Sequence, residues 1–347
     1  MQRTRIALIV LALAALSHTT AKAELVIGSG SASDPIRFFS ANAQGIDAPV
    51  ATIEGAATQL GSATFGVYEP REQLIYVSDF WGQALRVYPA FTYGNVAPIR
   101  VLNPPNLGQT RASAPIVAHD EIAVIASNCC IYTYPLHANG NAVPPLRAIG
   151  WGGSTGSATE LDNPISLLYL RDTDEYVVSE WGRIIFHARL AGHYDAPTRR
   201  ITGPGVANSA GIAHDPEQHL LFVLRQDPWD AGTQSSRVRI AVFPDTASGD
   251  ATPLYTIEGP ATQLDLPIGN YVYGIGHDPW LHRIMVSSSS NSVPVNNRVL
   301  TFADTASGNA APVQVLLGSN LDGDYLGTPF AAPAERPAEI FVDGFEP

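Results

Sequence analysis

The segment FPDTASGDATPLYTIEGPATQL, residues 243–264, decides the fold because the chain repeats it. Its first half returns as FADTASGNAAP at 302–312, and its tail, IEGPATQL (257–264), matches IEGAATQL (53–60) at all but one position. Such self-similarity is the signature of a repeat architecture, in which each unit packs against its neighbours. We therefore expect one array of similar units.

The repeated segment centres on a Gly-x-x-x-Pro turn between two apolar strands, such as RIAVFP (239–244) and LYTIEG (254–259). A second pair of strands separates successive turns, as in GIAHDP (211–216) and LLFVLR (220–225). Each unit thus has four short antiparallel strands, named a, b, c and d in chain order, and radial stacking buries both faces of each unit. The prediction is an all-β, six-bladed β-propeller. The six turns are Gly45/Pro49, Gly94/Pro98, Gly140/Pro144, Gly192/Pro197 (one residue longer), Gly249/Pro253 and Gly308/Pro312.

Five units are complete from about residue 65, and the two ends of the chain must supply the sixth. The segment at 36–55 provides strands c and d, and PFAAPAERPAEIFVDGF (329–345) aligns with TFGVYEPREQLIYVSDF (64–80) as strands a and b. Closing the ring in this way removes exposed strand edges. In the alternative, LVIGS (25–29) is strand b, and 331–347 is a linker and tail.

The pattern GIAHDP…LLFV…RIAVFP (211–244) resembles NHL-type propeller repeats, which read roughly G-I-A-V-D-P…I-Y-V-A-D…R-I-x-V-F. The resemblance covers most of the chain after residue 23, although each motif is short. It implies a six-bladed propeller of a secreted bacterial protein. The chain departs from the family by having His where the family often has Val, at His119, His214 and His277.

The first 23 residues have the pattern of a secretory signal peptide: Arg3 and Arg5, an apolar run over 6–16, and an A-x-A site at 21–23. Residues 24–347 then form the propeller domain, secreted or periplasmic, with no membrane span. Their net charge is −15, since residues 1–23 hold three of the 20 basic residues and none of the 32 acidic ones. Such an acidic surface repels phosphate backbones, so nucleic acid is excluded as an expected partner.

The two cysteines, Cys129 and Cys130, are adjacent. In an oxidising compartment they can form a vicinal disulfide; alternatively they stay reduced or bridge between chains. Neighbouring cysteines cannot join distant parts of the fold, so the stability must come from the core.

Tryptophan and carboxylate residues recur in the b–c loops, which share one face of a propeller. A rim of this kind suits a sugar, a cation or a polypeptide. The competing interpretation is that each Trp caps its blade and each acid solvates a turn. The candidate binding residues are Asp79, Trp81, Glu180, Trp181, Asp227 and Trp229.

Metal sites are weaker candidates. His119, His214 and His277 end strand a beside the channel, and similar propellers include peptidyl-hydroxyglycine amidating lyase, which binds zinc with channel histidines. Each His here is followed by Asp in a recurrent turn, which favours a structural role. The loop NLDGDY (320–325) has an incomplete calcium pattern. No cofactor is therefore expected; zinc or calcium is the alternative.

The leading expectation is a non-catalytic, monomeric propeller that binds a protein, glycan or small molecule on its b–c loop face. The alternative is a metal-dependent enzyme of the lactonase or lyase type, which rests on fold analogy. The Gly-rich segment WGGSTGS (151–157) lacks the Lys and the following helix of a phosphate-binding loop, so it does not support a nucleotide-dependent enzyme.

Overall fold

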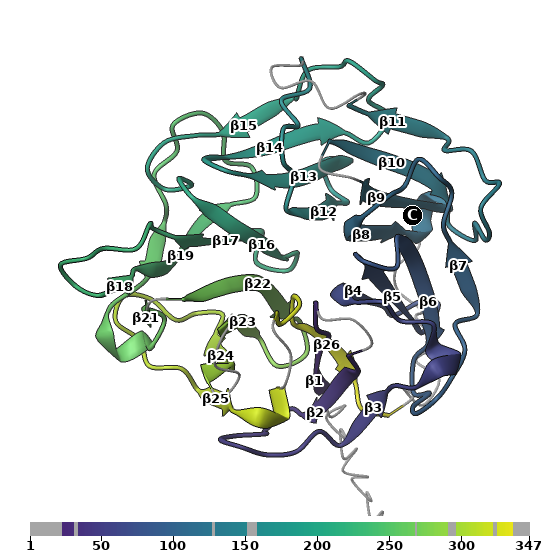
Figure 1. Ribbon diagram of the computed structural model, residues 1–347. Helices are drawn as coiled ribbons and strands as arrows, with labels where there is room; N and C mark the ends of the chain where they lie inside the picture. Colours follow the sequence, from purple (N-terminus) through teal and green to yellow (C-terminus); the bar gives the residue numbers. More distant parts are fainter. Residues whose placement is uncertain are drawn as a thin grey trace, which may run out of the picture.

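The computed structural model describes residues 23–30, 34–126, 129–150, 158–267, 269–290, 296–321 and 325–335. Six four-stranded antiparallel sheets stand in a ring around a central axis (Figure 1), which confirms the six-bladed β-propeller. Strand a of each sheet is innermost and strand d outermost. Among the described residues, no helix is long and apolar enough to cross a membrane.

The blades are numbered from the one that contains both ends of the chain. Blade 1 consists of β26 (Phe330–Pro333), β1 (Ala23–Ile27), β2 (Ile36–Ser40) and β3 (Ala51–Ile53). Blade 2 consists of β4 (Ala63–Glu69), β5 (Leu74–Asp79), β6 (Ala84–Pro89) and β7 (Arg100–Leu102). Blade 3 consists of β8 (Thr110–Ile116), β9 (Glu121–Ala126), β10 (Cys130–Pro135) and β11 (Arg147–Ile149).

Blade 4 consists of β12 (Ser166–Leu170), β13 (Glu175–Glu180), β14 (Arg183–Ala188) and β15 (Arg199–Ile201). Blade 5 consists of β16 (Ser209–Asp215), β17 (Leu220–Gln226), β19 (Val238–Pro244) and β20 (Tyr255–Ile257). Blade 6 consists of β22 (Asn270–Asp278), β23 (Arg283–Ser290), β24 (Arg298–Ala303) and β25 (Gln314–Leu317). Outside the blades lie a two-stranded sheet, β18 (Ser235–Ser236) with β21 (Leu266–Pro267), and the 3-10 turns η1 (Ala56–Thr58), η2 (Val117–His119), η3 (Pro260–Thr262) and η5 (Ser319–Leu321).

The ring closes with strands from both ends, but not in the predicted arrangement. Phe330–Pro333 is strand a as expected, and it pairs antiparallel with β1 from Ala23 to Val26. Strand b is therefore the N-terminal strand β1, and the prediction that the segment around Ile340 supplies it was wrong. Strand β1 fills that place because its apolar run Leu25–Ile27 is buried against both neighbouring blades. Residues 336–347 lie outside the described residues.

The Gly-x-x-x-Pro turns connect neighbouring blades through backbone hydrogen bonds. Gly249 and Gly308 have left-handed φ angles of 69° and 59°, which glycine adopts without strain. The Gly308 amide donates to the Thr256 carbonyl of the preceding blade at 2.6 Å, and the Gly249 amide donates to that of Arg200 at 2.7 Å. The near-identity of these segments thus reflects the repeated packing of a c–d turn on strand d of the blade before it.

Candidate functional site

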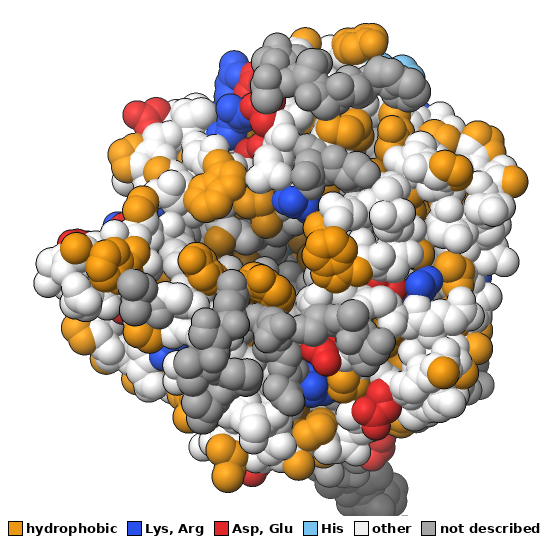
Figure 2. All heavy atoms as spheres, viewed as in Figure 1, with side chains coloured by type: hydrophobic (Ala, Val, Ile, Leu, Met, Phe, Trp, Pro, Cys, Tyr) orange, Lys and Arg blue, Asp and Glu red, His pale blue; other side chains and the backbone are white. Residues whose placement is uncertain are grey.

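The clearest cavity on the loop face, which carries the b–c and d–a loops, lies where blades 4, 5 and 6 meet. Its volume is about 740 Å³, and Trp181, Trp229 and Tyr271 contribute aromatic walls from the three blades. These side chains are 59%, 40% and 49% exposed, so their ring faces remain open to solvent. Figure 2 shows hydrophobic side chains around the central hollow of this face. We call this cavity the aromatic pocket.

The loop that carries Trp229 is tied down at both ends. Its first amide, from Asp227, donates to the Arg237 carbonyl at 2.9 Å, and the Asp230 amide donates to the Ser235 carbonyl at 3.0 Å. Strand β18, at the end of this loop, pairs with β21 from the loop before blade 6. These backbone bonds hold Trp229 over the pocket without a contribution from its own side chain.

Two amide side chains line the pocket between blades 5 and 6. The Gln226 amide bonds to both β22 neighbours: its nitrogen donates to the Asn270 carbonyl at 3.2 Å, and its oxygen accepts from the Val272 amide at 3.0 Å. Asn270 is buried, and its Oδ1 atom has no hydrogen-bond partner among the described residues. A buried acceptor without a partner costs free energy, so this oxygen is a local weak point in the packing between blades 5 and 6.

Of the predicted rim residues, the structure brings Trp181, Asp227 and Trp229 together in the aromatic pocket. Trp81 lies on the same face in blade 2, 62% exposed, with its ring against Phe80 at a centroid distance of 5.0 Å. It does not line the pocket. Tyr271 and Asn270 were not predicted from the sequence, because both come from the start of strand a rather than from a b–c loop.

The carboxylates of the predicted rim point inward and bind the protein itself. Asp79 is fully buried; Oδ1 accepts from the amides of Ser62 (2.6 Å) and Gly82 (2.8 Å), and Oδ2 accepts from Gly61 (2.8 Å) and lies 2.9 Å from Arg86 Nε. Asp227 pairs with Arg225 and Arg239 instead. These acids therefore connect segments of the blades.

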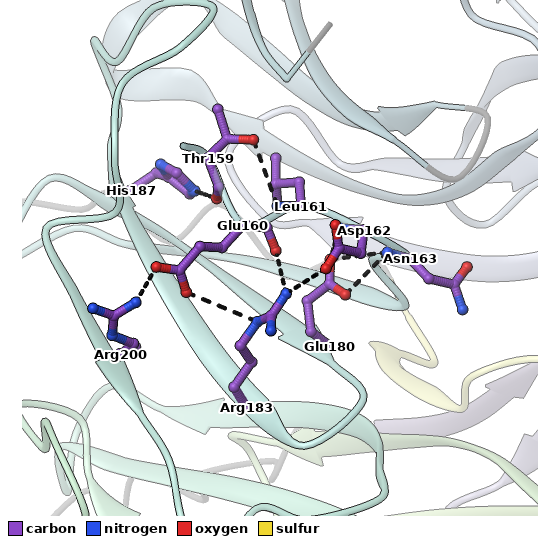
Figure 3. A network of polar contacts seen from close by, with 9 residues as sticks. All are labelled: Thr159, Glu160, Leu161, Asp162, Asn163, Glu180, Arg183, His187 and Arg200. Atoms are coloured by element: carbon purple, nitrogen blue, oxygen red, sulfur yellow. Dashed lines mark hydrogen bonds and ion pairs between the residues drawn. The ribbon is translucent and has the colours of Figure 1, made fainter. Parts of the chain in front are cut away.

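Glu180 repeats the role of Asp79 in blade 4. It ends strand b, is buried, and accepts from the amides of Asp162 and Asn163 at 3.0 Å (Figure 3). Arg183 lies beside this group and donates to Asp162 and to the carbonyl of Glu160. Desolvation outweighs these contacts and raises the pKa of Glu180 to about 7.

The raised pKa of Glu180 predicts how stability depends on pH. The folded protein holds a proton on Glu180 up to about pH 7, whereas the unfolded chain releases it near its usual value of 4.5, so stability falls as the pH rises through this window. Glu180→Gln should remove this loss, on the order of 2 to 3 kcal/mol between pH 4.5 and 8. Urea unfolding at several pH values measures it.

Glu54→Gln, on an exposed side chain, is the matched control and should leave the pH dependence as in the wild type. Burial also raises the pKa of Glu24 to about 7, and this contribution is the same in the wild type and in both variants, so it cancels in the comparison. Equal slopes in the Glu180 variant and the wild type would contradict the prediction.

The three histidines named in the sequence do not form one group of metal ligands in the described part of the chain, although His214 and His277 both line the central cavity. His119 Nε2 lies 3.8 Å from Asp174, and His214 Nε2 lies 3.1 Å from Asp245. His277 Nε2 lies between two carboxylates of its own surroundings, at 3.5 and 3.6 Å. Each His thus faces acids of its own or a neighbouring blade, on the turn face, which carries the a–b and c–d turns. The predicted calcium loop, 320–325, lies partly outside the described residues.

The structure joins Cys129 and Cys130 by a disulfide at the start of β10. Cys130 is buried and packs in the core between blades 2 and 3. The bridge shapes the b–c loop of blade 3 and does not reach the aromatic pocket.

No family model and no curated protein matches the sequence. Similarity to a solved structure is nevertheless clear: a chain of the "Crystal structure of Nidogen/Laminin Complex" superposes with a TM-score of 0.53 and 11% sequence identity, covering 89% of this chain and 98% of that one. At this identity the likeness shows the fold alone. The protein is thus a six-bladed β-propeller with an aromatic pocket on its loop face.

Proposed function

We propose that this protein is a secreted or periplasmic binding propeller that holds a glycan in the aromatic pocket. The observation that carries the proposal is the convergence of Trp181, Trp229 and Tyr271, from three blades, on one cavity. Aromatic faces provide apolar contact area for the C–H faces of a sugar ring at low entropic cost.

Two features support export. Residues 1–23 have the composition of a signal peptide, and cleavage after Ala23 leaves Glu24–Val26 of β1 to pair with β26. The Cys129–Cys130 disulfide persists in an oxidising compartment. The NHL resemblance has the same implication, as a likeness of repeat motifs.

A protein ligand is the second candidate, because one solved structure with the similar fold is that of a nidogen/laminin complex. An enzyme of the metal-dependent lactonase or lyase type would need ligands that converge on the channel. His119 and His214 pair with other carboxylates, and the one metal-ligand group found among the described residues contains only His277 of the three, so the binding role is favoured.

A glycan array tests the proposal directly. Trp181→Ala and Trp229→Ala should each weaken binding by about 2 kcal/mol, roughly thirtyfold, since buried Trp contacts dominate binding energy. Trp81→Ala removes a Trp that is about as exposed as Trp181, from the same face but outside the pocket, and should bind as the wild type does. Equal losses in all three variants, or none in the pocket variants, would reject the pocket. If the wild-type protein bound no glycan but bound displayed peptides, the ligand of the pocket would be a polypeptide and the glycan proposal would be rejected.

A further inference from the structure

Away from the aromatic pocket, on the turn face, three potential metal ligands meet between blades 5 and 6. They are Asp215 at the end of β16, His277 near the end of β22, and Asp304 after β24, and their ligand atoms all lie within 4.8 Å of one another. Among the described residues this is the one such group found. We call it the Asp–His–Asp group.

The imidazole of His277 is aimed into this group without a hydrogen bond. Its side chain is only 5% exposed, and Nε2 has no hydrogen-bond partner among the described residues. The nearest acceptors, Asp215 Oδ2 and Asp304 Oδ2, lie at 3.5 and 3.6 Å. The ring stacks on Phe222 at a centroid distance of 5.9 Å, which fixes its orientation.

Those separations suit a shared cation better than a pair of hydrogen bonds. Ligands about 2.0–2.2 Å from a tetrahedral zinc ion lie roughly 3.4 Å from one another. The two buried carboxylates form ion pairs only with His277 and His282 in the described part of the chain, so a divalent ion would balance their charge. One imidazole with two carboxylates is a donor set for a transition-metal ion such as Zn²⁺.

Gln218 provides a fourth donor. Its amide nitrogen now donates to Asp215 Oδ2 at 2.9 Å and to Asp304 Oδ2 at 3.2 Å, so the amide sits against the same two oxygens. Rotation of this amide by half a turn presents its oxygen to the group and completes four ligands. The central channel opens beside it, in a cavity of about 1030 Å³ lined by His277 and Glu217, which gives an ion a path.

We propose that Asp215, His277 and Asp304 bind one Zn²⁺ ion, with Gln218 as the fourth ligand, and that the ion joins blade 5 to blade 6. The equivalent group one blade earlier contains His214 and Asp245 of blade 5. In the place of Asp215, which the preceding blade supplies to the Asp–His–Asp group, it has Leu170 of blade 4. This earlier group therefore lacks the carboxylate that corresponds to Asp215, and its histidine, His214, provides the matched control. The zinc site is independent of the proposed glycan pocket, which lies on the opposite face.

Chelator-treated full-length protein titrated with ZnCl₂ in a calorimeter tests the site. The wild type should bind one equivalent, His277→Gln and Asp215→Asn should each weaken binding at least tenfold, and His214→Gln should bind as the wild type does. Zn²⁺ should also raise the melting temperature of the wild type and of His214→Gln but not of His277→Gln, provided circular dichroism shows that each variant is folded.

Two results would overturn the proposal: wild-type protein that binds zinc no more tightly than His277→Gln, or His214→Gln that loses binding to the same extent. Asp215→Asn is a second test of the site that does not depend on the folding of the His277 variant. It keeps the shape of the side chain and the Oδ1 acceptor for the Glu217 and Gln218 amides.

Discussion

A protein truncated after Pro329 should lose about 5 kcal/mol or more of unfolding free energy, because the truncation removes the innermost strand of blade 1. Strand β26 makes four residue pairs with β1, and Phe330, Ala331 and Ala332 are buried between blades 6 and 2. Loss of a buried Phe alone costs about 3–5 kcal/mol, and an unpaired β1 edge adds to it. Thermal unfolding followed by circular dichroism should show a melting temperature lower by more than about 10 °C.

A second truncation, after Glu335, isolates the effect of the strand. It keeps every described residue, so its melting temperature should stay close to that of the full chain. Phe330→Ala should fall between the two, since it removes the core contact but leaves the backbone pairing. If both truncated proteins melted at the same temperature, β26 would not close the ring.

The repeats in the sequence were sufficient to predict the blades. The a–b and c–d hairpins connect neighbouring strands, so their apolar alternation and turn residues are encoded locally. Ring closure depends instead on pairing between residues 23–27 and 330–333, at opposite ends of the chain. The alignment of Phe330 with Phe65 identified strand a correctly, but local pattern could not decide between Leu25–Ile27 and the segment near Ile340 for strand b.

The candidate sites were less predictable, because residues that share a loop can point in opposite directions. Glu180 and Trp181 are adjacent, yet the carboxylate is buried and the indole is exposed. The inward turn depends on the backbone amides of Asn163 and Asp162, 17 and 18 residues earlier in the chain, which donate to the carboxylate. Asp79 likewise accepts from amides 17 and 18 residues earlier in the chain, at Ser62 and Gly61. Comparison of these two blades in the sequence could therefore have indicated that the acids are structural.

In the Asp–His–Asp group, a residue that the repeat pattern marks as structural is proposed to bind a ligand. Asp304 belongs to the repeated FADTASG segment and has the place of Asp245 in FPDTASG, so the repeat alone suggests a turn residue. Its role differs because the preceding blade supplies Asp215 at a place where blade 4 supplies Leu170. Contacts between blades give equivalent residues different chemistry, and a single repeat cannot reveal this.

Asp79→Ala should destabilise the protein by about 3–5 kcal/mol, because it leaves buried partners without their acceptor. The carboxylate accepts three backbone hydrogen bonds and pairs with Arg86, whose side chain is 9% exposed. Alanine removes all four contacts at once and leaves a buried positive charge uncompensated. Urea unfolding near neutral pH, with the melting temperature as a second measure, gives the change in free energy.

Two comparisons show that burial, rather than the loss of a hydrogen bond, sets this cost. Asp47 also accepts a backbone amide, from Gln44 at 2.9 Å, but is exposed, so Asp47→Ala should cost less than about 1 kcal/mol. Adding Arg86→Met to Asp79→Ala should recover part of the loss, because it removes the unpaired buried charge. Equal costs for the two single Asp variants, or a double variant at least as unstable as the sum of its parts, would show that Asp79 and Arg86 do not act as a buried pair.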